Sequence, residues 1–578
     1  MSCWVLGISA LYHDSAAVLL RDGVVVAAAQ EERFSRIKHD RALPTRAVKW
    51  CLDEAGITTA DLEALVYYEK PLKKFERILV TLVATSPFSW RNFVLAMHSW
   101  LSDKLWLKNA LVSKFAIAPD RILFSEHHLS HAASAFFASP FQEADVLAID
   151  GVGEYATTSL WRGQQDAGTL ESIAEIHYPH SIGMLYSTLT AFLGFVVNEG
   201  EYKVMGMSPF GEPVYLDKMR QLVEFHDDGG FSLNMKYFAF THHSTTPYSP
   251  KLIELLGEPR FPGSDFTPGE TNSQHYANVA SSLQVLTEEL LLHLVKHAHK
   301  TLGGKNLCLA GGVALNSVAN QRIARESPYE NLWIQPAAGD AGGALGAALW
   351  AWRSILKGED RYTLERCDLG RSWQRDEVRG ILNDLGIEFE DLGSIENAVQ
   401  RAADELAAGG VIGWFQGRFE WGPRALGHRS ILADPRTEEM RDRVNARIKF
   451  REAFRPFAPA VLVEHADDWF DIPDALRPSM HYMMATVPVL EEKRAEIPAT
   501  THVDGSARAQ LVDKDKQPVF HQLLSEFHQR TGVPVLLNTS FNLRGEPIVS
   551  GPIDAIATLL RSELDALYIE GFRVVRVD

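Results

Sequence analysis

Runs of apolar residues separated by short polar turns occur in a pattern that repeats once in the first third of the chain. Residues 5–9 are apolar, a polar turn follows, and residues 16–20 are apolar again. Residues 146–150 are followed in the same way by a glycine-containing turn and by the run 157–161. Each copy predicts a strand, a turn and a second strand.

Later segments extend the alternation of strands and helices. Small and apolar residues predict a helix over 127–139, and residues 309–316 have the pattern of a strand that runs into a helix. The glycines of 339–346 open another helix, whereas 411–415 and 533–537 have the continuous apolar character of buried strands. This alternation predicts an α/β fold.

The repeated strand–turn–strand unit is typical of actin-like ATPases, which are duplicated α/β domains that hold phosphate between the turns of their two opening hairpins. Gly311, Gly312 and Asn316 lie where a strand enters a helix, and Gly339 to Gly346 open a second helix. Free backbone N–H groups at such points favour a nucleotide cleft. Glycines also form plain turns and allow close packing of helices, so both interpretations stay open.

A change in composition predicts a second domain. The helical pattern around residues 344–356 gives way to the polar run 357–361, after which a new alternation of strands and helices begins. We therefore place a boundary near residue 365, with a duplicated actin-like domain over 1–365 and a second α/β domain over 366–578.

Two histidines are the first candidate for a metal site. On a helix, His127 and His131 lie one turn apart on the same face, where both imidazoles reach one ion. Asp150 ends an apolar run and Asp340 stands in a glycine-rich turn, so each is a candidate for a further ligand. The alternative is that these histidines cap a helix or satisfy hydrogen bonds in the core.

Basic residues gather in the second domain and predict an anion pocket. Arg424, Lys449, Arg451 and Arg455 lie among Phe, Trp, Gly and Pro residues, whereas other arginines nearby have acidic neighbours that indicate a salt-bridged surface. Residues with hydrogen-bonding side chains at the ends of predicted strands complete the candidate set for nucleotide and phosphate, namely Arg508, Ser540 and Asn542.

Composition narrows the class of protein. The 578 residues are 46% hydrophobic and 23% charged, and no apolar run is long enough to span a bilayer. Because Met1 leads directly into a strand-like segment, we expect no signal peptide, a cytoplasmic location and no membrane partner. The net charge of −17 opposes nucleic-acid binding, and the four scattered cysteines indicate reduced thiols.

The motifs together resemble those of bacterial O-carbamoyltransferases of the NodU/CmcH type, including enzymes that tailor antibiotics. The resemblance covers nearly the whole chain and rests on Gly7 to Ser9 with His13-Asp14, Glu31 to Arg36, His127 to His131, Asp150-Gly151, Gly200 to Gly206, Gly311 to Asn316, Gly422 to Gly427 and Asn538 to Asn542. It implies an actin-like N-terminal domain related to TsaD, the tRNA threonylcarbamoyltransferase subunit, and a YrdC-like C-terminal domain.

The resemblance also implies a reaction in two steps. Carbamoyl phosphate and ATP would form carbamoyl-adenylate in the C-terminal domain, and the carbamoyl group would then pass to an acceptor hydroxyl in the N-terminal domain. The basic residues, Arg455 among them, would neutralise the substrates, and a metal ion on His127, His131, Asp150 and Asp340 would orient the adenylate. Similar family members use iron, here Fe(II), although these ligands also suit zinc or manganese, and Mg²⁺ would accompany ATP.

Two further residues of the first domain keep two interpretations each. His13 would take the proton of the acceptor hydroxyl, or would only shape the first turn together with Asp14. Lys203 would hold phosphate, or would form an ion pair with Glu199 or Glu201.

Three other functions fit parts of the sequence less well than carbamoyl transfer. A sugar kinase would leave the arginine-rich second domain unexplained, a threonylcarbamoyl-tRNA transferase conflicts with the negative charge, and a nucleotide sensor would not need both sites.

The small-molecule acceptor is expected to be a hydroxyl of a glycosylated natural product. The aromatic segment 72–111 would line the substrate site or form an interface in a homodimer, yet core packing is the simplest expectation for Trp90, Trp100 and Trp106.

Overall fold

The chain forms two units, and the second unit takes in a short piece of the N-terminal region. The computed structural model describes residues 2–102, 104–243, 245–452 and 454–576. The first unit comprises 1–27 and 43–363, and the second comprises 28–42 and 364–578. Nothing in the sequence had assigned residues 28–42 to the second unit.

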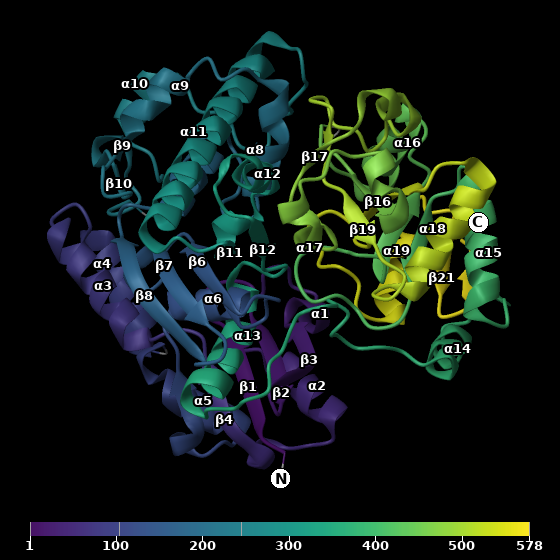
Figure 1. Cartoon of the computed structure of the whole chain (residues 1–578), viewed down its shortest axis with the longest axis horizontal. Coiled ribbons are helices and arrows are strands. Elements are labelled where there is room, and N and C mark those ends of the chain that lie inside the picture. Colours follow the sequence, from purple (N-terminus) through teal and green to yellow (C-terminus); the bar gives the residue numbers. More distant parts are fainter. Residues whose placement is uncertain (1, 103, 244, 453, 577–578) are drawn as a thin grey trace. The chain divides into compact units, whose positions relative to one another are not determined.

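The first unit opens with a five-stranded sheet (Figure 1). Its strand order is β3-β2-β1-β4-β5, in which β1 is antiparallel to β2 and parallel to β4, and β4 is parallel to β5. These strands are β1 (Trp4–Ser9), β2 (Ala16–Arg21), β3 (Val24–Gln30), β4 (Leu62–Tyr67) and β5 (Ile122–Phe124).

A second five-stranded sheet in the same unit repeats this topology. Its order is β8-β7-β6-β11-β12, with β7 antiparallel to both neighbours and β6, β11 and β12 parallel. The strands are β6 (Glu143–Ile149), β7 (Ala156–Gln164), β8 (Thr169–His177), β11 (Asn306–Ala310) and β12 (Asn331–Ile334). Two copies of one strand order confirm the predicted duplicated actin-like architecture.

Two helices lie between these sheets and position the site. Helix α13 (Asp340–Trp350) packs on β1, β2 and β4, helix α6 (His127–Phe136) packs on β6 and β11, and the two helices pack on each other. Their close approach requires glycine, because a Cβ at Gly346 would lie 1.7 Å from the carbonyl oxygen of Ser130. Helix α6 ends three residues before the predicted end at 139.

Other helices cover the first unit. They include α2 (Thr45–Ala55), α3 (Pro71–Ala84), α4 (Trp90–Ser102), α5 (Leu107–Phe115), α7 (Ile182–Phe192), α8 (Glu201–Met207), α11 (Thr271–Leu302) and α12 (Ser317–Glu326). The expectation of core packing is right for Trp100, which is 6% exposed, and wrong for Trp90 and Trp106, which are 68% and 60% exposed. The apolar side of α4 faces solvent in part.

The second unit is built on an eight-stranded mixed sheet of order β13-β22-β21-β14-β15-β20-β16-β19. The strands are β13 (Phe389–Asp391), β14 (Ile412–Phe415), β15 (Arg429–Ala433), β16 (Ala458–Leu462), β19 (Gln510–Val512), β20 (Val535–Ser540), β21 (Ala566–Ile569) and β22 (Phe572–Val574). Its main helices are α14 (Arg375–Asp384), α15 (Ile395–Ala407), α16 (Glu438–Arg443), α18 (Pro518–Thr531) and α19 (Pro552–Leu560). The predicted α/β class is thereby confirmed for this unit too.

Two smaller observations concern the chain as a whole. All four cysteines are free, as the sequence indicated. Among the helices of the described ranges, none has both the length and the apolar character to cross a membrane.

Candidate functional site

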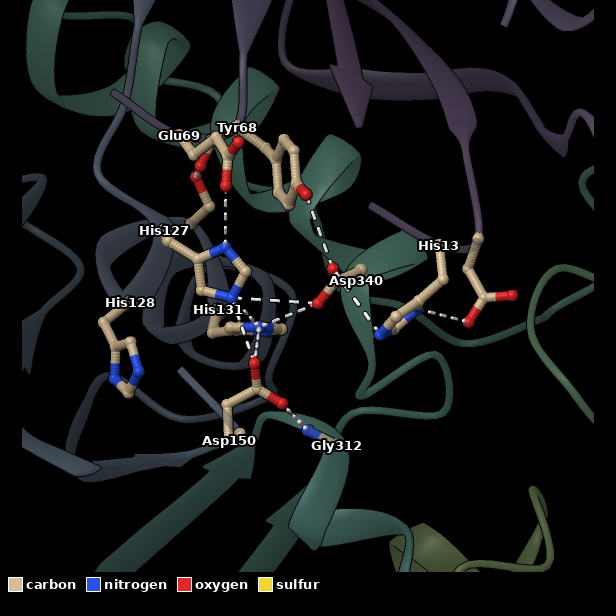
Figure 2. Close-up of polar contacts among 12 residues, drawn as sticks. His13, Tyr68, Glu69, His127, His128, His131, Asp150, Gly312 and Asp340 are labelled. Atoms are coloured by element: carbon tan, nitrogen blue, oxygen red, sulfur yellow. Dashed lines mark hydrogen bonds and ion pairs between the residues drawn. The ribbon is translucent and has the colours of Figure 1, made fainter. Parts of the chain in front are cut away.

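The two histidines and two aspartates singled out in the first domain come together at one buried point (Figure 2). Helix α6 supplies His127 and His131, Asp150 follows β6, and Asp340 opens α13. The Nε2 atoms of the histidines are 3.1 Å apart, and Asp150 Oδ2 lies 3.1 Å from His127 Nε2. Asp340 Oδ1 lies 3.7 and 3.6 Å from the Nε2 atoms of His127 and His131.

These atoms fit the coordination shell of a divalent metal ion. Four ligands about 2.1 Å from an ion in a tetrahedron are separated by roughly 3.4 Å, close to the spacings observed. Asp340 is completely buried, and its Oδ1 accepts no hydrogen bond from the described residues. A buried carboxylate oxygen without a hydrogen-bond donor is suited to a cation, and two imidazoles with two carboxylates suit iron, zinc or manganese alike.

The electrostatics of the cluster depend on close opposite charges. Burial lowers the pKa of His127, but the carboxylates of Asp340 and Asp150 outweigh burial and place that pKa well above its ordinary value. Burial raises the pKa of Asp150, and the neighbouring imidazoles more than reverse this, so the net pKa lies well below its usual range. The carboxylate of Asp150 is therefore ionised and ready to hold a cation.

Several residues that the sequence did not single out hold the ligands in place. Glu69 Oε2 lies 3.7 Å from His127 Nδ1 and 2.6 Å from Lys74 Nζ, and Glu154 accepts a hydrogen bond from the backbone N–H of His127. Tyr68 donates to Asp340 Oδ2 at 3.4 Å. The signal for Tyr68 and Glu69 was their position just after β4, at the carboxyl end of a parallel strand.

His13 lies beside the cluster. Its Nδ1 is 2.9 Å from Asp14 Oδ2, and its Nε2 is 3.9 Å from Asp340 Oδ2. Burial lowers the pKa of His13, but the charges of Asp340 and Asp14 exceed that effect and raise the pKa to about 9. Without a compensating cation His13 is therefore protonated at neutral pH.

The glycine segment after β11 supports the cluster of two histidines and two aspartates. The backbone N–H of Gly312 donates to Asp150 Oδ1 at 2.9 Å. Gly311 has φ +90° and leaves no room for a Cβ next to the backbone of Ile149, while Asn316 caps α12 by accepting from the N–H of Ala319. Close packing and capping explain these residues here, and their assignment to nucleotide binding stays a prediction.

Replacing Gly311 by alanine should destabilise the first unit. A Cβ would lie 2.2 Å from the carbonyl oxygen of Ile149, and the positive φ adds strain, so we expect a loss of about 1–3 kcal/mol. Gly303→Ala is the control, because its φ is +68° but no atom lies within 4 Å of the added Cβ. Thermal unfolding should show a larger fall in midpoint for Gly311→Ala; equal falls would contradict the steric explanation.

Lys203 lies on α8, where its Nζ is 5.7 Å from the ring centroid of Phe195. Glu201, one of its two predicted ion-pair partners, accepts hydrogen bonds from Ser187 and from the backbone of Asn198. The role of Lys203 in holding phosphate stays a prediction.

Lys449 lies at the centre of the candidate anion site in the second unit. It is 4% exposed, and its Nζ donates to Ser540 and Asn542 through four contacts of 2.6 to 3.2 Å. Burial, together with the charges of Arg451 and Arg455, holds the pKa of Lys449 well below its ordinary value. An anionic ligand would offset the excess positive charge here.

The predicted arginines surround Lys449 in part. Arg451 donates to Asn445 at 2.8 Å, and burial with the neighbouring charges of Arg455 and Arg508 lowers its pKa. Arg455 lies 3.9 Å from Glu452 and keeps 30% of its side chain exposed. Electrostatic repulsion thus acts among four cationic side chains, those of Lys449, Arg451, Arg455 and Arg508. Arg424 is half-buried in the loop 416–428 between β14 and β15.

That loop is organised by two buried residues that sequence reasoning missed. One carboxylate oxygen of Glu420 accepts hydrogen bonds from the backbone N–H groups of Leu426, His428 and Arg429. The guanidinium of Arg429 donates to the carbonyl oxygens of Gln416 and Gly417, and burial lowers its pKa to about 10. Glu420 precedes its three backbone donors by six to nine residues, and this spacing forms no recognisable sequence motif.

Comparison with known families identifies the class of protein. Residues 4–349 match the model described as the carbamoyltransferase N-terminus, and residues 403–576 match the carbamoyltransferase C-terminus. The chain belongs to the carbamoyltransferase family, as its motifs indicated, and its activity is therefore in carbamoyl transfer.

Individual relatives cover nearly the whole chain. The uncharacterized protein sll1178 of Synechocystis sp. is 47% identical over 98% of this chain and 96% of its own length. Nodulation protein NolNO of Sinorhizobium fredii is 39% identical over 97% of this chain and 79% of its own. Among solved structures, component A of the Acidaminococcus fermentans (R)-2-hydroxyglutaryl-CoA dehydratase is 14% identical, covering 61% of this chain and 98% of that one; its TM-score of 0.32 is too low to carry an argument.

Proposed function

We propose that the protein is an ATP-dependent O-carbamoyltransferase with one half-reaction in each unit. The second unit converts ATP, carbamoyl phosphate and water into carbamoyl-adenylate, pyrophosphate and phosphate. The first unit transfers the carbamoyl group to an acceptor hydroxyl and releases AMP. The observation that carries this proposal is the match to both carbamoyltransferase domains, each with its own cluster of functional side chains.

In the first half-reaction the cations neutralise the two phosphorylated substrates. Lys449 and Arg455 bind phosphate oxygens and stabilise the charge that builds up as pyrophosphate leaves. Arg424, Arg451 and Arg508 contribute further charge, and Ser540 and Asn542 position both Lys449 and the nucleotide. The low pKa of Lys449 supports this role, because anion binding would stabilise its charged form.

In the second half-reaction the first unit binds the adenylate. His127, His131, Asp150 and Asp340 would hold a divalent ion, Fe(II) by resemblance to the family, and this ion would supply Lewis-acid chemistry to the phosphate group. His13 takes the proton of the acceptor hydroxyl at Nε2 once the negative charge of Asp340 is compensated, while Asp14 fixes the ring through Nδ1. We take the acceptor to be a sugar hydroxyl of a glycosylated natural product.

The proposal is tested by following pyrophosphate and AMP separately. We expect pyrophosphate release from ATP to require carbamoyl phosphate but no acceptor, and AMP release with a carbamoyl mass gain to require a hydroxyl acceptor. Mass spectrometry of aminoglycoside and macrolide acceptors detects the second step. Formation of ADP and a phosphorylated sugar would overturn the proposal in favour of a kinase.

A further inference from the structure

The helices α3 and α4 expose an unusual amount of apolar surface. Between residues 72 and 106, nine large hydrophobic side chains are more than half exposed: Leu72, Val80, Val83, Phe88, Trp90, Val94, Leu95, Leu101 and Trp106. We call this group the α3–α4 surface. A concentration of this kind on a protein surface marks a binding site rather than ordinary scatter.

The exposed residues follow the helical period. On α4, Trp90, Val94, His98 and Leu101 are spaced by four, four and three residues, so they form one stripe that faces solvent. A surface helix of a globular protein normally turns such a stripe inward. The two helices pack on each other, and Phe88 in the turn between them is 81% exposed.

Positive charge accompanies these apolar side chains. Residues 86–114 contain four basic residues and one acidic residue, although the whole chain has a net charge of −17. Arg91 and Lys108 are exposed, and Lys104 Nζ lies 5.4 Å from the ring centroid of Trp100. Long cationic side chains beside tryptophans are suited to an apolar medium bordered by anions.

We propose that the α3–α4 surface docks on an anionic lipid bilayer, with α4 lying along the bilayer surface. At 13 residues α4 is roughly 20 Å long, whereas a spanning helix needs about 20 residues. A helix that lies flat on a bilayer needs no spanning segment, so the lack of a long apolar run does not exclude this membrane partner. This inference is independent of the proposed function.

A second copy of the chain is the competing occupant, and the charge distribution opposes it. A two-fold interface sets the same surface of both copies face to face, so the cations Arg91, Lys104 and Lys108 of one copy would be brought close to those of the other. An anionic bilayer attracts these same cations.

The surface also adjoins the metal cluster, because Lys73 on α3 is 2.7 Å from Glu126, the residue before His127. Docking would therefore bring the metal cluster near the lipid headgroups.

Co-sedimentation of the full chain with lipid vesicles tests the proposal. We expect binding to vesicles that contain phosphatidylglycerol, weaker binding at high salt and little binding to pure phosphatidylcholine. Phe88→Ser with Trp90→Ser should lower partitioning by about tenfold or more, since two large apolar side chains are lost. Arg91→Glu with Lys108→Glu should weaken binding to anionic vesicles only.

Controls separate lipid docking from misfolding and from dimer formation. Phe261→Ser removes an apolar side chain that is 79% exposed elsewhere on the first unit, and it should leave vesicle binding unchanged. Thermal unfolding checks that each variant is folded. Absence of binding to anionic vesicles overturns the proposal, as does an equal loss of binding in Phe261→Ser. Sedimentation velocity showing a dimer that only the Phe88 and Trp90 substitutions dissociate, without vesicle binding, would assign the surface to a second copy.

Discussion

Replacing His131 by alanine should abolish carbamoyl transfer while leaving carbamoyl-adenylate formation intact. The substitution removes one of four buried donor atoms that lie within 4.8 Å of one another, so metal affinity should fall by more than about 100-fold. The cations that we propose bind ATP and carbamoyl phosphate belong to the other unit and keep their contacts. Metal content and AMP release should therefore fall together, while pyrophosphate release continues.

His128→Gln provides a matched control on the same helix. His128 is buried next to the cluster, but its Nδ1 contacts Ser159 Oγ at 2.8 Å and it is not one of the four clustered residues. This variant should retain its metal. A folded His131→Ala protein with full metal content and normal transfer would refute the metal assignment. Loss of both half-reactions in a folded variant would refute the separation of the two sites.

Replacing Arg455 by alanine should have the opposite effect and stop pyrophosphate release. The guanidinium supplies charge next to Lys449 and Arg451, and a phosphoryl substrate that lost this contact would bind weakly and react slowly. We expect a fall in rate of at least about 100-fold. Stability should change by less than about 0.5 kcal/mol, because the side chain is partly exposed and its removal relieves repulsion among buried cations.

The control for this substitution is Arg447→Ala. Arg447 is 64% exposed and forms a 3.3 Å ion pair with Glu563 at the surface, so its loss should leave pyrophosphate release unchanged. Metal content should be normal in both variants. Normal pyrophosphate release by Arg455→Ala would exclude this residue from the first half-reaction.

Local sequence patterns were sufficient to predict the repeated strands and the placement of two histidines on one face of a helix. The run 5–9 lies within β1, and the run 146–150 lies within β6 except for Asp150, which follows the strand. The four-residue spacing of His127 and His131 places both on one side of α6. The predicted end of α6 at residue 139 lies three residues beyond its observed end. Pro140 disfavours helical geometry at Ser139, and the small and apolar residues before it do not extend the helix to that point.

Contacts that depend on tertiary structure were not visible in the sequence. Glu69 reaches His127 across 58 positions, and Glu154 reaches the same residue from the loop after β6. Apolar periodicity also says which residues share a face but not whether that face turns inward, which is why Trp90 and Trp106 were expected in the core. The packing of Gly311 against Ile149 and the hydrogen bond from Gly312 to Asp150 likewise depend on the tertiary structure, and the phosphate site predicted for these glycines stays a prediction.

Residues 28–42 limit how the second unit can be exchanged between proteins. Buried Arg33 donates to the carbonyl oxygen of Gly422 at 2.9 Å, and Arg36 donates to those of Pro547 and Ile548 at 2.9 and 2.7 Å. A polypeptide of residues 366–578 would leave these three carbonyl oxygens without their guanidinium donors. The second unit is thus not a continuous cassette, and recombination that replaces only the C-terminal half of the gene would separate it from part of its own fold.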